Sequence, residues 1–138
     1  MLALNIVIFK DEKPQIQSIR NTVFTIEQGV DSTIDFDGQD DDAIHVLVKE
    51  NGRAVGTGRM LADGHIGRVA IIKESRGEGV GAKVVLRLVD EAIKLNFASV
   101  YLGAQLQAVD FYLKLGFTPY GEEYIEADIK HISMEKVL

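Results

Sequence analysis

Fifteen residues near the middle of the chain decide the fold: Val69-Ala70-Ile71-Ile72-Lys73-Glu74-Ser75-Arg76-Gly77-Glu78-Gly79-Val80-Gly81-Ala82-Lys83. An apolar run leads into a turn with three alternate glycines, and this turn opens a helix. Glycine allows the backbone to adopt positive φ and to approach a ligand closely. The first N–H groups of a helix have no partners within it, and the helix dipole adds partial positive charge there. The pattern therefore predicts a turn that binds a pyrophosphate.

Two other phosphate-binding motifs do not match this turn. The Rossmann fingerprint spaces its glycines as G-x-G-x-x-G within a βαβ unit, whereas the glycines here stand at 77, 79 and 81 and follow an antiparallel meander. The Walker A loop requires a Gly-Lys-Ser/Thr sequence, which the chain lacks. A tight strand-to-helix turn without any ligand remains the alternative from the residues alone.

Upstream of the turn, the residues predict one strand, one helix and a meander. Residues 2–9 have the pattern of a strand, and Pro14 suits the first turn of a helix that stops near Gly29. Asn51-Gly52 is a strong hairpin signal, because both residues tolerate positive φ. The meander is expected to contain these three strands: 44–48, 54–61 and 66–72.

Downstream of the turn, a helix over 79–95 has apolar residues at helical spacing. A strand at 98–102, a helix at 105–115 and a closing β-hairpin over 117–137 should follow. The resulting order β-α-β-β-β-α-β-α-β-β predicts an α/β fold with a mixed, largely antiparallel central sheet and flanking helices. We expect residues 1–138 to form a single domain.

The composition is that of an ordinary soluble protein. The 138 residues are 46% apolar and 26% charged, and no apolar run approaches the length of a membrane-spanning helix. The net charge of −6 argues against nucleic acid as a partner. The chain has no cysteine, and its start lacks the features of a signal peptide, so we expect a cytoplasmic protein with no membrane partner.

Acidic residues gather between Asp31 and Asp42. The run lacks the residue order of a calcium-binding loop, including the distal glutamate, so no metal is predicted. We expect a loop or short irregular helix over 30–42 whose solvated carboxylates could attract cationic amines.

Two signatures in this chain resemble those of the GCN5-related N-acetyltransferases (GNATs). Arg76-Gly77-Glu78-Gly79-Val80-Gly81 is similar to the acyl-coenzyme A signature Arg/Gln-x-x-Gly-x-Gly/Ala. Gln105-x-x-Ala108-x-x-Phe111-Tyr112-x-x-Leu115-Gly116-Phe117 is similar to the second signature, which usually begins with Asn. The resemblance covers nearly the whole chain. Four further segments are Val23-Phe24-x-x-Glu27-Gln28-Gly29-Val30, Asp37-Gly38-x-Asp40, Leu102-Gly103-Ala104-Gln105 and Glu126-x-Asp128-Ile129-Lys130-His131-Ile132-x-Met134. They resemble the ElaA/YjcF-like branch of small bacterial members. One departure is Ala127-Asp128-Ile129-Lys130, where that branch more often has Asp-Gly-Ile-Pro.

The resemblance implies the GNAT fold and acetyl-coenzyme A (acetyl-CoA) as co-substrate. In this family two neighbouring strands splay apart, and the pantetheine arm pairs with the edge of one of them. The residues implied to bind the cofactor are Val69, Ala70 and Ile71 along the strand, Arg76, Gly77, Glu78, Gly79, Val80 and Gly81 around the pyrophosphate, and Gln105.

Three residues are candidates for catalysis. Tyr112 stands where the family commonly carries a tyrosine that protonates the departing thiolate, and its alternative role is packing. Glu27, at the end of the first helix, could accept the amine proton or could simply be solvated. His131 is a candidate base in the last hairpin, ahead of His45, and both could instead be structural; His65 is assigned no role.

We therefore expect an acetyl-CoA-dependent N-acetyltransferase that modifies a primary amine of a small molecule, peptide or protein by direct attack. The alternative is a non-catalytic module of the same fold that binds or senses acyl-CoA. The loops at 29–43 and 120–131 should determine the acceptor, but they carry no readable code for it. The exposed strands of the last hairpin could support a homodimer.

Overall fold

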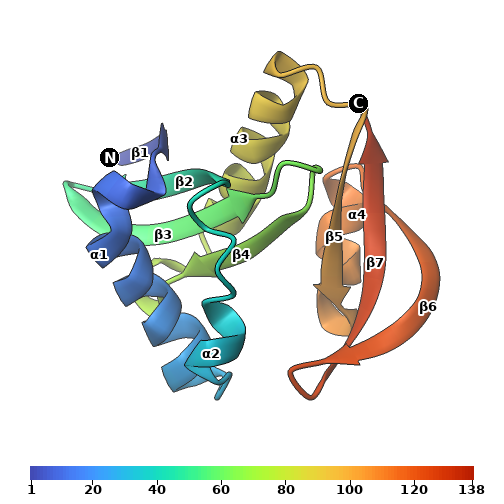
Figure 1. Ribbon diagram of the computed structural model, residues 1–138, viewed down its shortest axis with the longest axis horizontal. Helices are drawn as coiled ribbons and strands as arrows, with labels where there is room; N and C mark the ends of the chain where they lie inside the picture. Colours follow the sequence, from blue (N-terminus) through green and yellow to red (C-terminus); the bar gives the residue numbers. More distant parts are fainter.

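Two antiparallel sheets form the framework of the protein, seen in a computed structural model that describes residues 1–138 (Figure 1). The first sheet has the strand order β1-β2-β3-β4 and the second has the order β5-β7-β6. The elements of the first part are β1 (Leu2–Val7), α1 (Phe9–Arg20), the π-helical segment η1 (Asn21–Glu27), α2 (Ser32–Asp35), β2 (Ile44–Glu50), β3 (Arg53–Met60) and β4 (Ile66–Ile71). Those of the second part are the 3₁₀ turn η2 (Lys73–Ser75), α3 (Val80–Lys94), β5 (Ser99–Gln105), the 3₁₀ turn η3 (Leu106–Ala108), α4 (Val109–Lys114), β6 (Thr118–Glu126) and β7 (Ile129–Val137). The predicted order is confirmed, with the short α2 added.

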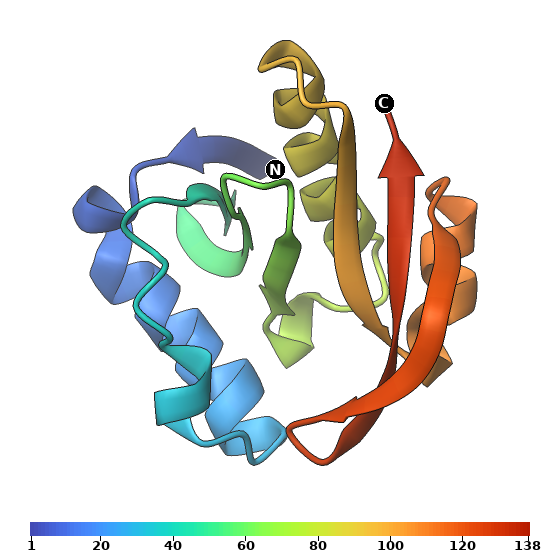
Figure 2. The same cartoon turned by 45° about the vertical axis from the view of Figure 1, so that its right-hand side comes forward.

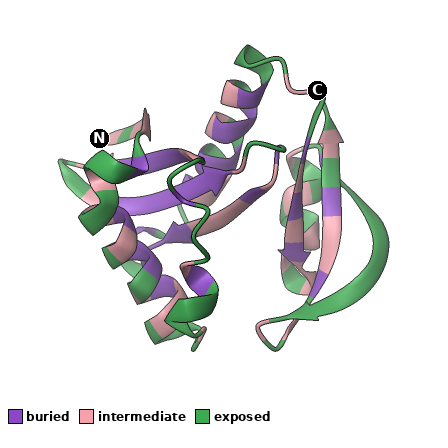
Figure 3. Cartoon of the chain, in the orientation of Figure 1, coloured by how far each residue is buried: buried purple, intermediate pink, exposed green.

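The first sheet is covered on both faces, by α1 on one and α3 on the other (Figure 1). The apolar row of α3 predicted from the sequence is buried: Val80, Val84, Leu88 and Ala92 are each at most 1% exposed. The absence of a side chain at Gly58 lets α3 lie very close to β3. A Cβ at Gly58 would stand only 2.5 Å from Cγ1 of Val84. Buried residues accordingly concentrate on β2, β3 and the inner side of α3 (Figure 3). None of the helices combines the length and apolar character needed to cross a membrane.

Only one β-bridge joins the backbones of the two sheets. A single parallel bridge joins His65, just before β4, to Tyr101 on β5. From there β4 and β5 run apart, and no ladder connects them (Figure 2). The parallel component of the predicted mixed sheet is thus reduced to this bridge, and the splay expected from the resemblance is present.

The N-terminal boundaries differ from the prediction. β1 ends at Val7, and the apolar Phe9 begins α1, where its buried ring packs against the ring of His45 at 5.0 Å between centroids. Pro14 therefore lies inside α1, but the helix is broken at Glu12, which has φ −119° and ψ 16°. Because proline cannot donate the N–H that a continuous helix needs, the break precedes it and Pro14 still occupies a first turn.

The second difference concerns the segment after α3. The strand predicted at 98–102 extends to Gln105. The helix predicted at 105–115 is preceded by the turn η3, and its α-helical part, α4, begins only at Val109. Gln105 therefore belongs to the end of a strand. The longer strand is explained by its partner, since all of Ser99–Gln105 pairs with β7.

β6 is the outer edge of the second sheet, and all nine of its residues are exposed (Figure 3). Its pairing with β7 shifts between Tyr120 and Tyr124: Tyr120 stands opposite Ser133 and Tyr124 opposite His131. Three residues of β6 therefore face one residue of β7, and Gly121 adopts φ +74° within this bulge.

Candidate active site

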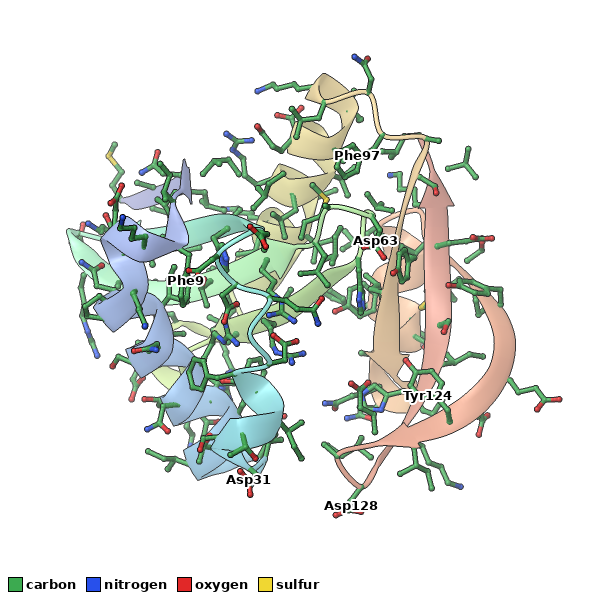
Figure 4. All side chains as sticks on the ribbon, in the orientation of Figure 1. Phe9, Asp31, Asp63, Phe97, Tyr124 and Asp128 are labelled. Carbon is green, nitrogen blue, oxygen red and sulfur yellow. The ribbon has the colours of Figure 1, made fainter.

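A cavity of about 240 Å³ lies where β4 and β5 diverge. Its walls come from η1 and α2 on one side, from β4, and from β5, α4 and the β6–β7 hairpin on the other. Figure 4 shows Asp63 near the end where the two sheets meet, and Asp31 and Asp128 on the two loops that face each other at the opposite end. Segments distant in sequence thus build one site.

The edge of β4 that faces this cavity has unpaired backbone groups. The N–H of Ile72 donates to the carbonyl of Val55 on β3 at 2.9 Å. Successive residues of a regular strand direct their N–H and C=O groups to alternate sides, so those of Ile71 point away from β3. Val69 lies at the register shift and has no partner in the β3–β4 register. β5 does not pair with this edge. The backbone of Val69 and the N–H of Ile71 can therefore bind an extended ligand. The carbonyl of Ile71 already accepts a hydrogen bond from Arg76, and Ala70 contributes to the ladder with β3.

The glycine-rich turn begins α3 as predicted. Gly79 is the N-cap residue, with φ +76°, and the first backbone bond into the helix is donated by Lys83 to the carbonyl of Gly79 at 3.1 Å. The N–H groups of Val80, Gly81 and Ala82 consequently have no partner within the helix, and no side chain caps them. Gly77 and Glu78 are exposed beside this helix start, which has the features of an anion site.

Arg76 is held between the end of β4 and η1. Its Nε donates to the carbonyl of Ile71 at 2.8 Å, and its Nη1 and Nη2 pair with the carboxylate of Glu27 at 2.8 and 2.9 Å. Glu27 does not line the cavity. The structure thus brings Glu27 to the glycine-rich turn, and it does not bring Glu27 together with Tyr112 and His131.

Tyr112 lines the cavity from α4. Its ring packs edge-to-face against Phe117 at 6.0 Å between centroids. Burial raises the pKa of the Tyr112 phenol above its usual value. The phenol therefore remains protonated at neutral and mildly alkaline pH, as a proton donor must.

His131 lines the same cavity from β7, directly opposite Gln105 of β5 in the strand register. Its Nδ1 lies 2.7 Å from the carbonyl of Ile129, and its ring stacks on Tyr124 at 5.6 Å between centroids. A carbonyl oxygen only accepts, so Nδ1 carries a proton, and in the neutral tautomer with this hydrogen bond the lone pair is on Nε2. Nε2 of His131 is therefore available as a base. Gln105 also lines the cavity.

His65 is a cavity residue that the sequence reasoning missed. Its ring stacks on Tyr101 with 4.7 Å between centroids and an interplanar angle of 11°. Burial lowers the pKa of His65, although the nearby carboxylate of Asp63 acts in the opposite direction. His65 stands directly before β4 in the sequence. That position indicates a cavity residue only when the bridge to Tyr101 on β5 is known, and the sequence does not show this bridge.

His45 is structural. Its Nε2 lies 2.9 Å from the carbonyl of Asp40, the residue is 1% exposed, and it does not line the cavity. The alternative that His45 serves as a base is therefore wrong for this arrangement.

The expectation of a solvated acidic loop is also wrong. Asp35 and Asp40 are 2% and 6% exposed, and with Asp37 they pair with arginines from three other elements. The ion pairs of this arginine–aspartate cluster are Arg20 with Asp35 and Asp40, Arg59 with Asp37 and Asp40, and Arg68 with Asp35 and Asp37. These ion pairs attach the loop to α1 and the first sheet. Because three positive and three negative charges balance, the cluster does not act as a free acidic surface. No three His, Cys, Asp or Glu side chains come together as metal ligands would.

The cluster makes the stability of the protein depend on its carboxylates. Burial raises the pKa of Asp40, but hydrogen bonds and charges from Arg20 and Arg59 outweigh it, so the pKa lies below its usual value. A hydrogen bond from Arg59 likewise lowers the pKa of Asp37. Folded-state pKa values below the unfolded ones stabilise the protein at neutral pH, and this stabilisation is lost as the pH falls below about 4.

We expect Asp40→Asn to lower the free energy of unfolding by about 3 kcal/mol, because it leaves Arg20 and Arg59 short of a buried counter-charge. Urea unfolding at neutral pH measures this difference. Asp41→Asn is the matched control: Asp41 is exposed and makes no ion pair, so the expected change is within about 0.5 kcal/mol. Equal stabilities of the two variants would contradict the role given to the cluster.

The comparisons with known proteins agree with this geometry. The family model described as "Acetyltransferase (GNAT) domain" matches residues 15–138. The chain is 33% identical over 122 residues to the uncharacterized N-acetyltransferase YjcF of Bacillus subtilis, covering 86% of this chain and 87% of YjcF. It is 34% identical over 127 residues to the protein ElaA of Escherichia coli, covering 86% and 82% of the two chains. The crystal structure of Escherichia coli ElaA superposes with a TM-score of 0.87 and 30% identity over 99% of each chain. An acyl-CoA N-acyltransferase from Pseudomonas aeruginosa gives a TM-score of 0.88 at 29% identity, over 99% of this chain and 100% of the other.

Proposed function

Because the chain belongs to the GNAT acetyltransferase family, we propose that it is an acetyl-CoA-dependent N-acetyltransferase that acts on a primary amine. The observation that supports this best is the cavity itself. It is bounded by the unpaired edge of β4, by the phenol of Tyr112 and by the imidazole of His131. A thioester, an acid and a base can therefore meet in one place.

The donor lies along β4 and the glycine-rich turn in this proposal. The backbone of Val69 and the N–H of Ile71 bind the pantetheine arm, and the free N–H groups at the start of α3 hold the pyrophosphate. Gly77 contributes to this pyrophosphate site through its positive φ of 84°, which shapes the turn. The side chain of Val80 is buried, so Val80 contributes only its backbone N–H. The Arg76–Glu27 pair holds the glycine-rich turn against η1.

The chemistry follows from the two side chains that face the cavity. The amine nitrogen attacks the thioester carbon, so a C–N bond forms as the C–S bond breaks. Nε2 of His131 accepts the proton that the amine nitrogen loses, and the phenol of Tyr112 donates a proton to the departing sulfur. Holding both reactants in this geometry can lower the barrier by about 7–11 kcal/mol, so positioning is the larger contribution of the protein.

Thiol release from acetyl-CoA in the presence of a panel of primary amines is the experiment that tests this function. We expect turnover with at least one amine that fits a cavity of about 240 Å³, which favours small acceptors. Mass spectrometry of the acceptor should show the gain of one acetyl group. Tight binding of coenzyme A without turnover on any amine would instead indicate a module that senses acyl-CoA.

A further inference from the structure

Arg68 occupies an unusual place in the cavity wall. It sits in the middle of β4 at a register shift opposite β3, and its φ of +50° is rare for a residue with a side chain. Such backbone conformations persist where the surrounding structure holds them, and they concentrate at functional sites. The side chain of Arg68 lines the cavity and is 23% exposed. The bulge therefore delivers a guanidinium to the space between the two sheets.

Two edges of this guanidinium are fixed, and one corner is free. Nε donates to the carbonyl of Asp35 at 3.1 Å, and Nη2 donates to the carbonyl of Ile34 and to Oδ2 of Asp37, both at 3.2 Å. Nη1 makes no hydrogen bond to the protein, although it carries two N–H donors. The segment around α2 thus holds Arg68 in one orientation and leaves Nη1 unused.

We propose that the acceptor is an amine that also carries a carboxylate, and that Nη1 of Arg68 binds this carboxylate. The proposal rests on the function proposed above and names the substrate class of the same cavity. Carboxylates are the preferred partners of guanidinium donors, and a guanidinium held in place loses little entropy on binding them. The arginine–aspartate cluster has no net charge, so an incoming carboxylate meets no excess of negative charge there.

The rest of the cavity suits the other end of such a molecule. Glu126, on the hairpin wall, is exposed and has no ion-pair partner, so it can attract an ammonium group. His131 on the same wall supplies the base. The apolar side chains of Phe24, Ile34 and Ile66 line the cavity beside these polar groups and can contact a short hydrocarbon portion. Amino acids and similar small aminocarboxylates combine all three features.

The test uses amines in matched pairs with and without the carboxylate: alanine and ethylamine, leucine and 3-methylbutylamine, phenylalanine and 2-phenylethylamine, and 4-aminobutanoate and propylamine. Thiol release from acetyl-CoA gives kcat/KM for each amine. For each pair, the kcat/KM of the amine with the carboxylate is divided by the kcat/KM of the amine without it. For at least one pair we expect this ratio to be about 10–100-fold lower in Arg68→Gln than in the wild type, the value of a charged hydrogen bond. Differences in amine basicity, and any general effect of the substitution on folding, cancel in this ratio.

Arg53→Gln is the matched control, because Arg53 is exposed at the start of β3 and does not line the cavity. It should leave the ratio unchanged. An unchanged ratio in Arg68→Gln, or a wild-type protein that acetylates only amines without a carboxylate, would overturn the proposal and leave the acetyltransferase function intact.

Calorimetry separates the two proposals further. N-acetylalanine, N-acetylleucine, N-acetylphenylalanine and 4-acetamidobutanoate are titrated into wild-type and Arg68→Gln protein saturated with coenzyme A. If no amine releases thiol, but one of these carboxylates binds the wild type at least about tenfold more tightly than the variant, the carboxylate site stands without the catalytic function. If neither turnover nor binding occurs, both proposals fail.

Discussion

Tyr112→Phe should lower kcat by about 10²–10⁴-fold, the usual contribution of general-acid catalysis. The substitution removes only the hydroxyl, so the edge-to-face packing on Phe117 and the fold are retained. Thermal unfolding and coenzyme A affinity should therefore remain close to those of the wild type. Thiol release on an accepted amine, measured under saturating conditions, gives the change in kcat.

The pH dependence provides a second measurement for the same residue. Burial raises the pKa of Tyr112 above that of a free phenol, so the acid form persists to a pH above about 10. An alkaline limb in the wild-type rate profile that is lost in Tyr112→Phe would report this phenol. Tyr120→Phe is the matched control, because Tyr120 is exposed on β6 and outside the cavity. Full turnover by Tyr112→Phe would mean that Tyr112 contributes packing alone.

Gly81→Asp should weaken coenzyme A binding by about 100-fold or more, because it places a negative charge beside the pyrophosphate and like charges in contact cost several kcal/mol. Gly81 is the second residue of α3, and its N–H is one of the free donors. An aspartate in the first turn of a helix is favourable for the helix itself, so the folded state should persist. Calorimetric titration of coenzyme A measures the loss.

Gly81→Ala separates charge from bulk at this position. A Cβ on Gly81 would meet only Cζ of Phe111, at an ordinary distance of 3.9 Å. The alanine variant should therefore bind coenzyme A nearly as well as the wild type. If the aspartate variant did so too while folded, the pyrophosphate would have to lie elsewhere.

The sequence was sufficient where the signal is local. The row of apolar residues in α3, the Asn51-Gly52 hairpin and the glycine-rich helix start all depend on neighbours within a few positions, and each is present in the structure. Tyr112, His131 and Gln105, which were chosen as site residues, all line the cavity, and their roles stay predictions. That selection depended on the resemblance to a family, because a spacing of 26 residues between Gln105 and His131 has no local meaning.

The sequence was not sufficient where pairing crosses large distances along the chain. The acidic segment that contains Asp35, Asp37 and Asp40 has the pattern of a solvated loop. Nothing near it in the sequence shows that Arg59 on β3 and Arg68 on β4 pair with these carboxylates in the fold. An acidic segment and scattered arginines are individually ordinary surface features. Only the fold converts them into a buried neutral cluster.

The same reason explains two placements that the sequence did not indicate. Glu27 is 49 residues from Arg76, and their ion pair could not be inferred from either motif. His65 lies at the cavity because the one bridge between the two sheets joins it to Tyr101. Both placements depend on how segments distant in sequence assemble.

The bulge in β6 bears on how the protein can associate with itself. A straight, unpaired strand at the edge of a sheet invites a second molecule to add its own strand, which leads to aggregation. Here the bulge interrupts the regular backbone groups of that edge, and Glu122 and Glu123 are exposed within it. Two copies approaching edge to edge would bring like charges together. Pairing of two copies through this edge is therefore unfavourable, which helps to keep a concentrated solution of the protein free of fibrous assemblies.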